Sequence, residues 1–305
     1  MTTTSYRVAG HAVTLHFCRE EDLALIRSFK PFRLEEVVKE PVMELTVDDA
    51  IELDATDHEI GHFDCGGCDT AVYRLSDRGY RIEFYNIKKQ LCGGLQSDRT
   101  FRHNLLKVQC QEPSDRRFAI NNTLMVCYAF ATADQDTMLM HASVIRHAGK
   151  GYLMTAPSGT GKSTHTRLWY DNIPGCDLMN DDNPVVRIID GQAIVYGSPW
   201  SGKTPCYRNI EAPIGGLVRL WQKPENSIRR LPVIEGYSHL LSAMSNMKWD
   251  ERVFRGISHG VSELVRICGV WGLGCLPNAE AAFLCQRTLE GTDQPASPTT
   301  DFEER

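Results

Sequence analysis

The sequence lacks a long apolar run, and it also lacks an extended basic run. Spanning a bilayer takes about 20 consecutive apolar residues, and no stretch approaches that length. The chain carries 33 Lys and Arg against 39 Asp and Glu, a formal net charge of −6, so nucleic acid is not an expected partner. Residues 1–7 lack the basic-then-apolar pattern of a signal peptide. These absences predict a cytoplasmic protein with no membrane partner.

A disulfide framework is also missing, although cysteine itself is abundant. The 11 cysteines are odd in number and scattered, and most stand in apolar segments, as do Cys127, Cys268 and Cys285. Disulfide scaffolds belong to secreted chains with paired cysteines at regular spacings. The pattern therefore predicts reduced cysteines that are mostly buried.

Length and composition allow two globular parts. With 305 residues, 42% of them apolar and 24% charged, the chain is long enough for two domains or one large one. We predict an α/β (α+β) protein with a strand-rich domain at 1–134 and a second domain at 135–287. Residues 288–305, which are rich in Gly, Pro, Ser, Thr and acidic residues, are predicted to form a disordered tail.

Hydrophobic periodicity and turn residues predict the elements of each part. In the first part we expect strands at 13–17, 71–75 and 80–84, with a hairpin turn at Asp77-Arg78-Gly79, and helices at 20–29 and 122–133. In the second part we expect strands at 140–145, 152–155, 176–180, 185–189, 193–196 and 216–221, then mostly helix over 234–284, with one strand at 265–268 or 270–271.

A compact group of metal-ligand residues stands in the first part. His58, His62, Cys65 and Cys68 follow the spacing H-x3-H-x2-C-x2-C and offer four zinc-type ligands within eleven residues. Structural zinc sites usually join two separated pairs, and so short a run rarely surrounds a tetrahedral ion. We therefore favour a glycine turn with two small side chains over a zinc site or a redox pair.

The segment Ala156-Pro-Ser-Gly-Thr-Gly-Lys-Ser163 carries the strongest motif. It follows a predicted strand and precedes a predicted helix over 164–170, the context of a phosphate-binding P-loop (Walker A). Its glycines let backbone N–H groups turn toward an anion, and the helix N-terminus adds positive potential. Lys162 can then reach the terminal phosphates, and the Ser163 hydroxyl can bind Mg²⁺. The usual first glycine is Ala156 here, and the alternative is a simple turn with an incidental lysine.

An acidic pair follows at the end of the next strand. Phosphoryl transfer needs carboxylates to hold the metal and a group to deprotonate the acceptor. Asp181 and Asp182 stand about twenty residues after Lys162, and side chains alternate along a strand, so the two carboxylates can serve the two roles. The alternative is a plain turn at residues 181–184, whose composition is turn-like.

Three further residues are candidates for the same site. His141 ends a strand-like run that we expect beside the P-loop strand, where it can orient an aspartate, although a lone histidine is more often a core residue. Lys203 and Arg208 stand in or near a Ser-Gly-Lys-Thr turn and can grip an acidic substrate or the migrating phosphoryl group. An exposed basic loop is the alternative. His165, Arg167 and Arg219 are weaker candidates that we expect at the surface.

Taken together, His141-Ala-Ser-Val144, the segment 156–163 and Asp181-Asp182 resemble the HPr kinase/phosphorylase and phosphoenolpyruvate carboxykinase superfamily. The resemblance covers residues 140–189 strongly and continues loosely to 281. It implies a mixed-sheet P-loop kinase core, with the N-terminal domain used for recognition or assembly. It also implies that ATP and Mg²⁺ bind at Ser158, Gly159, Thr160, Gly161, Lys162, Ser163 and Thr164. Asp181 is expected to be the base supported by His141, and Asp182 a metal contact.

The resemblance implies an ATP- and magnesium-dependent kinase that phosphorylates a serine or another hydroxyl group. The acceptor is a peptide, a protein or a small molecule; HPr itself is not implied, because its phosphorylase motif is not found. One alternative is carboxykinase-like chemistry on a small dicarboxylic acid, and another is a nucleotide-binding regulatory module without turnover. A homo-oligomer is compatible with the sequence, which does not fix the oligomeric state.

Overall fold

The computed structural model describes residues 1–56, 58–64, 68–76, 79–202 and 204–291. Cys65, the turn residues Asp77 and Arg78, Lys203 and most of the predicted tail lie outside these ranges. No helix within the described ranges is long and apolar enough to cross a membrane.

The first sheet contains eight strands in the order β1-β2-β3-β8-β7-β6-β5-β4. They are β1 (Thr2–Val8), β2 (His11–Phe17), β3 (Met43–Val47), β4 (His58–Asp64), β5 (Asp69–Arg74), β6 (Tyr80–Tyr85), β7 (Leu91–Ser97) and β8 (His103–Val108). The 3₁₀ helix η1 (Glu20–Phe32) packs against β1 and the helix α1, and α1 (Pro113–Ala131) covers β3, β7 and β8. The predicted strands at 71–75 and 80–84 are confirmed, whereas the helix predicted from 122 begins nine residues earlier, at Pro113.

The second sheet runs in the order β12-β10-β11-β15-β14-β13-β9, with β17 beside β15 and β16 beside β17. Its strands are β9 (Thr137–Leu139), β10 (Ala142–His147), β11 (Lys150–Thr155), β12 (Asp177–Asp182), β13 (Val185–Ile189), β14 (Gln192–Tyr196), β15 (Glu211–Gln222), β16 (Ser227–Arg230) and β17 (Trp271–Cys275). The helices are α2 (Lys162–Asn172), α3 (Val233–Ala243), α4 (Glu251–Cys268) and α5 (Ala279–Leu289). The alternative strand at 265–268 is wrong, because those residues end α4, and α5 includes the first two residues of the predicted tail.

Strand directions bring four strand ends to one edge of the second sheet. β11, β15 and β17 are parallel to one another, and β10 is antiparallel to both β11 and β12. β12 therefore runs in the same direction as β11. The carboxyl ends of β12, β11, β15 and β17 all lie on this edge, which is where open α/β sheets bind ligands.

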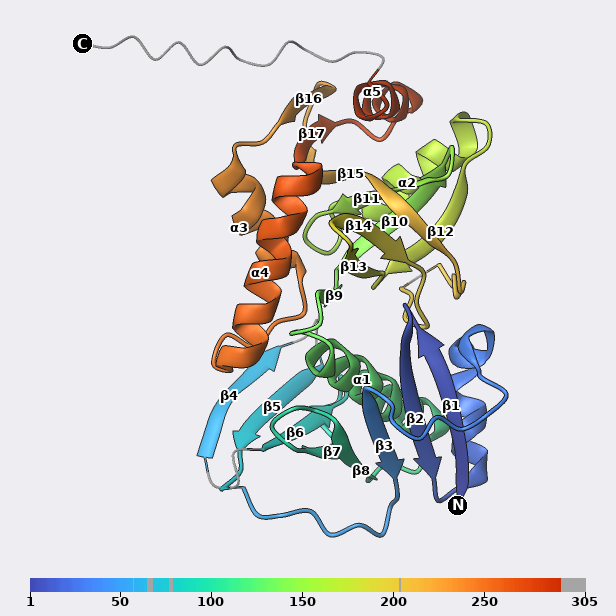
Figure 1. Ribbon diagram of the computed structural model, residues 1–305, viewed down its shortest axis with the longest axis vertical. Coiled ribbons are helices and arrows are strands. Elements are labelled where there is room, and N and C mark those ends of the chain that lie inside the picture. The colour runs from blue at the N-terminus through green and yellow to red at the C-terminus, as the bar shows by residue number, and fades with distance from the viewer. Residues whose placement is uncertain (57, 65–67, 77–78, 203, 292–305) are drawn as a thin grey trace, which may run out of the picture.

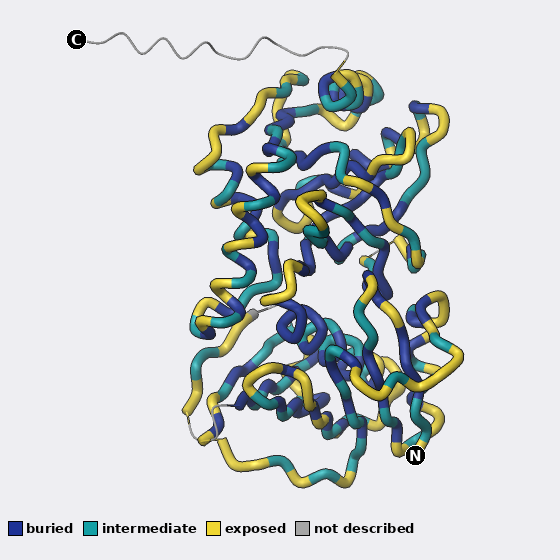
Figure 2. Tube along the Cα trace, viewed as in Figure 1, coloured by how far each residue is buried: buried dark blue, intermediate teal, exposed yellow. Residues whose placement is uncertain are grey.

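One continuous hydrophobic core joins the two sheets, since buried apolar side chains from β1 through α4 belong to a single cluster. Buried residues recur along the chain in both sheets (Figure 2), and α1 lies between the first sheet and the second part of the chain (Figure 1). The Tyr80 hydroxyl donates to Asp250 Oδ2 at 2.7 Å, and the Arg187 guanidinium donates to the Ala9 carbonyl at 2.8 Å. Because buried contacts cross between the parts, the division at residue 134 stays a prediction.

Candidate phosphate-binding and carboxylate site

The P-loop segment joins β11 to α2 at the common edge. Gly159 has φ +80° and Gly161 has φ +120°, conformations that side-chain-bearing residues rarely adopt. The Thr160 N–H donates to the Pro157 carbonyl at 3.3 Å, which closes the turn. Ala156 is not among the described residues with positive φ and is buried, so its Cβ meets no backbone strain. The alanine at the first motif position is therefore compatible with this loop.

Lys162 is the first residue of α2 and lies against the loop. Its side chain is buried, and Nζ donates to the Ala156 carbonyl at 3.0 Å. Burial lowers the pKa of Lys162, while the nearby charges of Asp182 and Asp181 oppose that shift. Nζ therefore contacts the loop and lies near enough to the acidic pair to interact with its charges.

Asp181 is held next to the loop by Ser163. The Ser163 Oγ donates to Asp181 Oδ1 at 2.7 Å, and the Thr204 N–H donates to Asp181 Oδ2 at 3.3 Å. Asp181 is only 3% exposed. A hydroxyl and a carboxylate in contact at a helix N-terminus are hard oxygen ligands of the kind that Mg²⁺ prefers.

Asp182 takes a different environment from Asp181. Its backbone has φ +132°, an unfavourable conformation for a residue with a side chain, and such strain often marks functional sites. Oδ1 lies 3.2 Å from His141 Nε2, and Oδ2 accepts a hydrogen bond from Asn183 Nδ2 at 2.7 Å. Both side chains of the His141–Asp182 pair are partly exposed, at 42% and 36%.

This geometry corrects the expected pairing of the two aspartates. His141 was expected beside Asp181, but it contacts Asp182, while Asp181 contacts the hydroxyl of Ser163. Successive strand residues point to opposite faces of a sheet, and the Asp181 side chain lies on the face that α2 covers. His141 also precedes β10 instead of ending a strand, and its backbone N–H donates to the Ala243 carbonyl at 2.7 Å.

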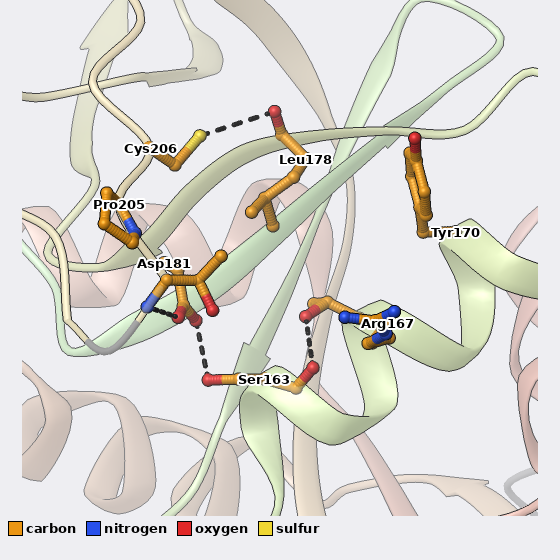
Figure 3. A pocket seen from close by; sticks show the side chains of 9 residues that line it. Ser163, Arg167, Tyr170, Leu178, Asp181, Pro205 and Cys206 are labelled. Carbon is orange, nitrogen blue, oxygen red and sulfur yellow. Dashed lines mark hydrogen bonds between the residues drawn. The ribbon is translucent and has the colours of Figure 1, made fainter.

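A cavity of about 360 Å³ opens beside Ser163 and Asp181 (Figure 3). Its walls come from α2, β12 and the loop after residue 203, and the lining residues are Ser163, Thr166, Arg167, Tyr170, Leu178, Asp181, Thr204, Pro205 and Cys206. Sequence reasoning missed Tyr170 and undervalued Arg167. The spacing of 163, 167 and 170 was the available signal, since such positions share one helical face.

Arg208 does not line this cavity. Its guanidinium donates to the Leu178 carbonyl at 2.6 Å and to Asp177 Oδ2 at 3.2 Å. Arg146 donates to both oxygens of the same carboxylate. Arg208 thus holds β12 in place, and this use of its guanidinium does not favour the predicted contact with substrate. Lys203, the other residue predicted to bind substrate, lies outside the described residues.

The weaker candidates divide into buried and exposed residues. His165 was expected at the surface, but it is 2% exposed, and its Nε2 accepts a hydrogen bond from Trp169 Nε1 at 3.2 Å. Arg167 is exposed and pairs with Asp171. Arg219 stacks over the Trp221 ring, with 4.4 Å between Cζ and the ring centroid.

His239, which no sequence signal marked, lies behind the P-loop strand. Its Nε2 contacts the Thr155 hydroxyl at 2.6 Å. The same hydroxyl donates its proton to the Val218 carbonyl, so the imidazole Nε2–H is the donor to Thr155. Burial, together with a smaller effect of nearby Arg219, lowers the pKa of His239 from 6.5 to about 4, and Glu235 opposes the shift.

We expect His239 to make the fold acid-sensitive. Between pH 6.5 and about 4 the unfolded chain binds a proton at this histidine and the folded chain does not, so the unfolding free energy falls as the pH is lowered. His239→Gln keeps a donor for Thr155, and its unfolding free energy should fall by about 3 kcal/mol less than that of the wild type over this range. Urea unfolding at pH 7 and pH 4 measures the difference, and equal losses would contradict the assignment.

The residues His58, His62, Cys65 and Cys68, for which we favour a glycine turn over a zinc site, form no group of close ligand atoms among the residues that can be described. Cys65 lies outside them, and His62 Nε2 pairs with Asp69 Oδ2 at 3.4 Å. The potential ligand atoms that do lie within 4.8 Å of one another in the described chain belong to Cys92, Cys110 and Asp115. None of the described cysteines forms a disulfide.

Comparisons with known proteins give distant structural likeness alone. No family model matches the chain, and no curated protein matches it either. Among solved structures, the HPr(Ser) kinase/phosphatase from Coxiella burnetii is similar over 50% of this chain and 95% of its own, with 12% sequence identity and a TM-score of 0.30. A likeness at this level assigns neither a family nor a function.

Proposed function

We propose that the protein is an ATP- and Mg²⁺-dependent phosphotransferase that acts on a hydroxyl acceptor. The observation that carries the proposal is the meeting of two pairs at one sheet edge. Ser163, which follows the proposed phosphate-binding lysine, contacts Asp181. His141 contacts the next residue in the chain, Asp182. In this proposal, different side chains that lie close together bind the phosphates, hold the metal ion and accept the proton.

The donor set fits a magnesium ion bound to a nucleotide. Ser163 Oγ and Asp181 Oδ1 are both oxygens and lie 2.7 Å apart, so both can face one small cation. When bound, Mg²⁺ neutralises charge on the phosphates and holds them in line for transfer. The P-loop N–H groups and Lys162 supply the remaining positive charge.

Asp182 is better placed than Asp181 to act as the base. Both carboxylates have both oxygens in contact with neighbouring groups, but Asp181 is almost fully buried. Asp182 is partly exposed, and His141 Nε2 holds its Oδ1. In this proposal Asp182 accepts the acceptor hydroxyl's proton, and His141 is the positioning residue that orients the carboxylate. These roles are the reverse of those expected from the sequence.

The cavity beside Ser163 and Asp181 suits the body of the acceptor; Asp182 does not line it, so in this proposal the acceptor's hydroxyl group reaches past Asp181 to Asp182. It is partly apolar, through Leu178, Pro205 and Tyr170, and Arg167 stands at its lining on the helix side. A serine side chain or a small hydroxyl compound can enter it, and Arg167 can pair with an acidic group on the acceptor.

Transfer from γ-labelled ATP tests the proposal. Label should appear on a hydroxyl group within a panel of serine peptides and small alcohols, in a Mg²⁺-dependent reaction that Arg167→Ala weakens for acidic acceptors. Label recovered only with oxaloacetate would favour carboxykinase-like chemistry. Nucleotide-dependent stabilisation without any transfer would favour a regulatory module and contradict the proposal; a hundredfold excess of ligand over Kd gives about 2.7 kcal/mol.

A further inference from the structure

A second cavity lies on the other side of the P-loop from the acidic pair. Its volume is about 410 Å³, within the range of small-molecule sites. The wall residues come from the P-loop, α2 and the carboxyl ends of β15 and β17, and they are Gly159, Thr160, Gly161, Thr164, His165, Leu168, Leu220, Trp221, Gln222, Lys223, Cys275, Leu276 and Pro277.

Sheet order fixes where this cavity lies relative to the reacting groups. The strands run β12, β10, β11, β15, β17, so the acidic pair ends β12, the P-loop follows β11, and the second cavity stands over the ends of β15 and β17. A phosphate chain in the P-loop therefore has the carboxylates at one side and this cavity at the other. Asp181 lines the first cavity, whereas neither aspartate lines the second, so the second cavity is the one farther from the acidic pair.

We propose that this second cavity binds the nucleoside of the nucleotide whose phosphates occupy the P-loop. The inference rests on the proposed function and names where its substrate's base and ribose lie. The transferred phosphate must face Ser163 and Asp181, so the opposite end of the nucleotide leaves the loop toward β15 and β17.

The chemistry of the walls suits a nucleoside. Leu168, Leu276 and Pro277 offer apolar surface for the face of a base, and Leu276 is 39% exposed. Gln222 Nε2 donates to the Thr160 carbonyl at 3.1 Å, which ties this wall to the P-loop.

A buried polar atom also belongs to this wall. Because His165 Nε2 accepts the Trp169 indole N–H, the proton of the neutral ring is on Nδ1. That Nδ1 is buried and has no hydrogen-bond partner within the described part of the chain. An unpaired buried donor costs free energy, and its residue lines this cavity; a base nitrogen or a ribose oxygen would pair with it once the atoms that cover Nδ1 move aside.

Binding of MgATP and of magnesium tripolyphosphate, measured by calorimetry on the full chain, tests the assignment. The wild type should bind ATP about tenfold or more tightly than tripolyphosphate, because only ATP brings a nucleoside. Leu276→Ala should weaken ATP about fivefold and leave tripolyphosphate unchanged. Tyr170→Ala, which alters the other cavity at an exposed residue, is the matched control and should leave both affinities unchanged.

Each other outcome overturns the inference in a recognisable way. If Tyr170→Ala weakens ATP and Leu276→Ala does not, the nucleoside lies in the other cavity. If wild-type protein binds ATP and tripolyphosphate equally, no nucleoside site exists, while the phosphate site stands. If neither ligand binds, or if Lys162→Ala leaves tripolyphosphate binding intact, the proposed function fails together with the inference.

Discussion

Asp182→Asn is expected to lower the rate of phosphoryl transfer by about a hundred- to ten-thousandfold, the usual contribution of a general base. Asparagine keeps the size of the side chain and can still contact His141, but it cannot accept a proton. The Kd for MgATP should stay close to that of the wild type, because the P-loop and Ser163 are untouched. Single-turnover kinetics at saturating MgATP, together with calorimetry, measure both quantities.

Asp181→Asn is the matched comparison. It removes charge beside Ser163 Oγ, so it should raise the Mg²⁺ concentration needed for half-maximal rate and weaken MgATP binding. If Asp181→Asn abolishes transfer at saturating Mg²⁺ while Asp182→Asn does not, the roles of the two carboxylates are exchanged. That result would restore the assignment expected from the sequence alone.

Arg116→Met is expected to destabilise the fold by about 3–5 kcal/mol, the usual cost of breaking a buried ion pair. Arg116 on α1 donates through Nε and Nη2 to both oxygens of Asp22 on η1, at 2.9 and 2.5 Å, and the side chains are only 3% and 1% exposed. Its guanidinium also donates to both oxygens of Asp49. Without the arginine, Asp22 is left as a buried and uncompensated charge. Urea unfolding at pH 7 measures the loss.

Two further variants make this prediction specific. Arg266→Met removes an exposed arginine that pairs with Glu263 on α4, and it should change the unfolding free energy by less than about 1 kcal/mol. Adding Asp22→Leu to Arg116→Met should recover much of the loss, because no buried charge remains unpaired. Equal losses for Arg116→Met and Arg266→Met would contradict the account of a buried ion-pair network.

Local motifs made the strand, the glycine turn and the helix around residues 156–161 predictable, while their use as a P-loop stays a prediction. A strand, a glycine turn and a helix are contiguous in the chain, so short-range patterns specify β11, residues 156–161 and α2. The hairpin of β13 and β14 around Asp190-Gly191 is confirmed for the same reason, since both residues have positive φ. The candidate site residues come together at one edge of the sheet because strands that are distant in the sequence pair with one another. No single segment of the sequence encodes that pairing.

The contacts within the site depend on that distant pairing. His141 meets Asp182 because β10 pairs with β12 with Ala142 opposite Asp182, and a shift of one residue would exchange the faces. The use of Arg208 as a brace for Asp177 depends on the path of the loop after β14. The buried state of His165 depends on its packing against Trp169, a core residue one turn further along α2.

The central claim is that the P-loop and the acidic pair form a phosphotransfer site. The most direct measurement is Mg²⁺-dependent formation of ADP from ATP by the wild type, by Lys162→Ala and by Lys150→Ala. Lys150 is an exposed lysine at the start of the same strand, β11, and serves as the control. The account predicts that Lys162→Ala lowers the rate by about a hundred- to a thousandfold, the usual cost of removing one transition-state donor, and that Lys150→Ala matches the wild type. Equal rates for all three proteins would contradict it.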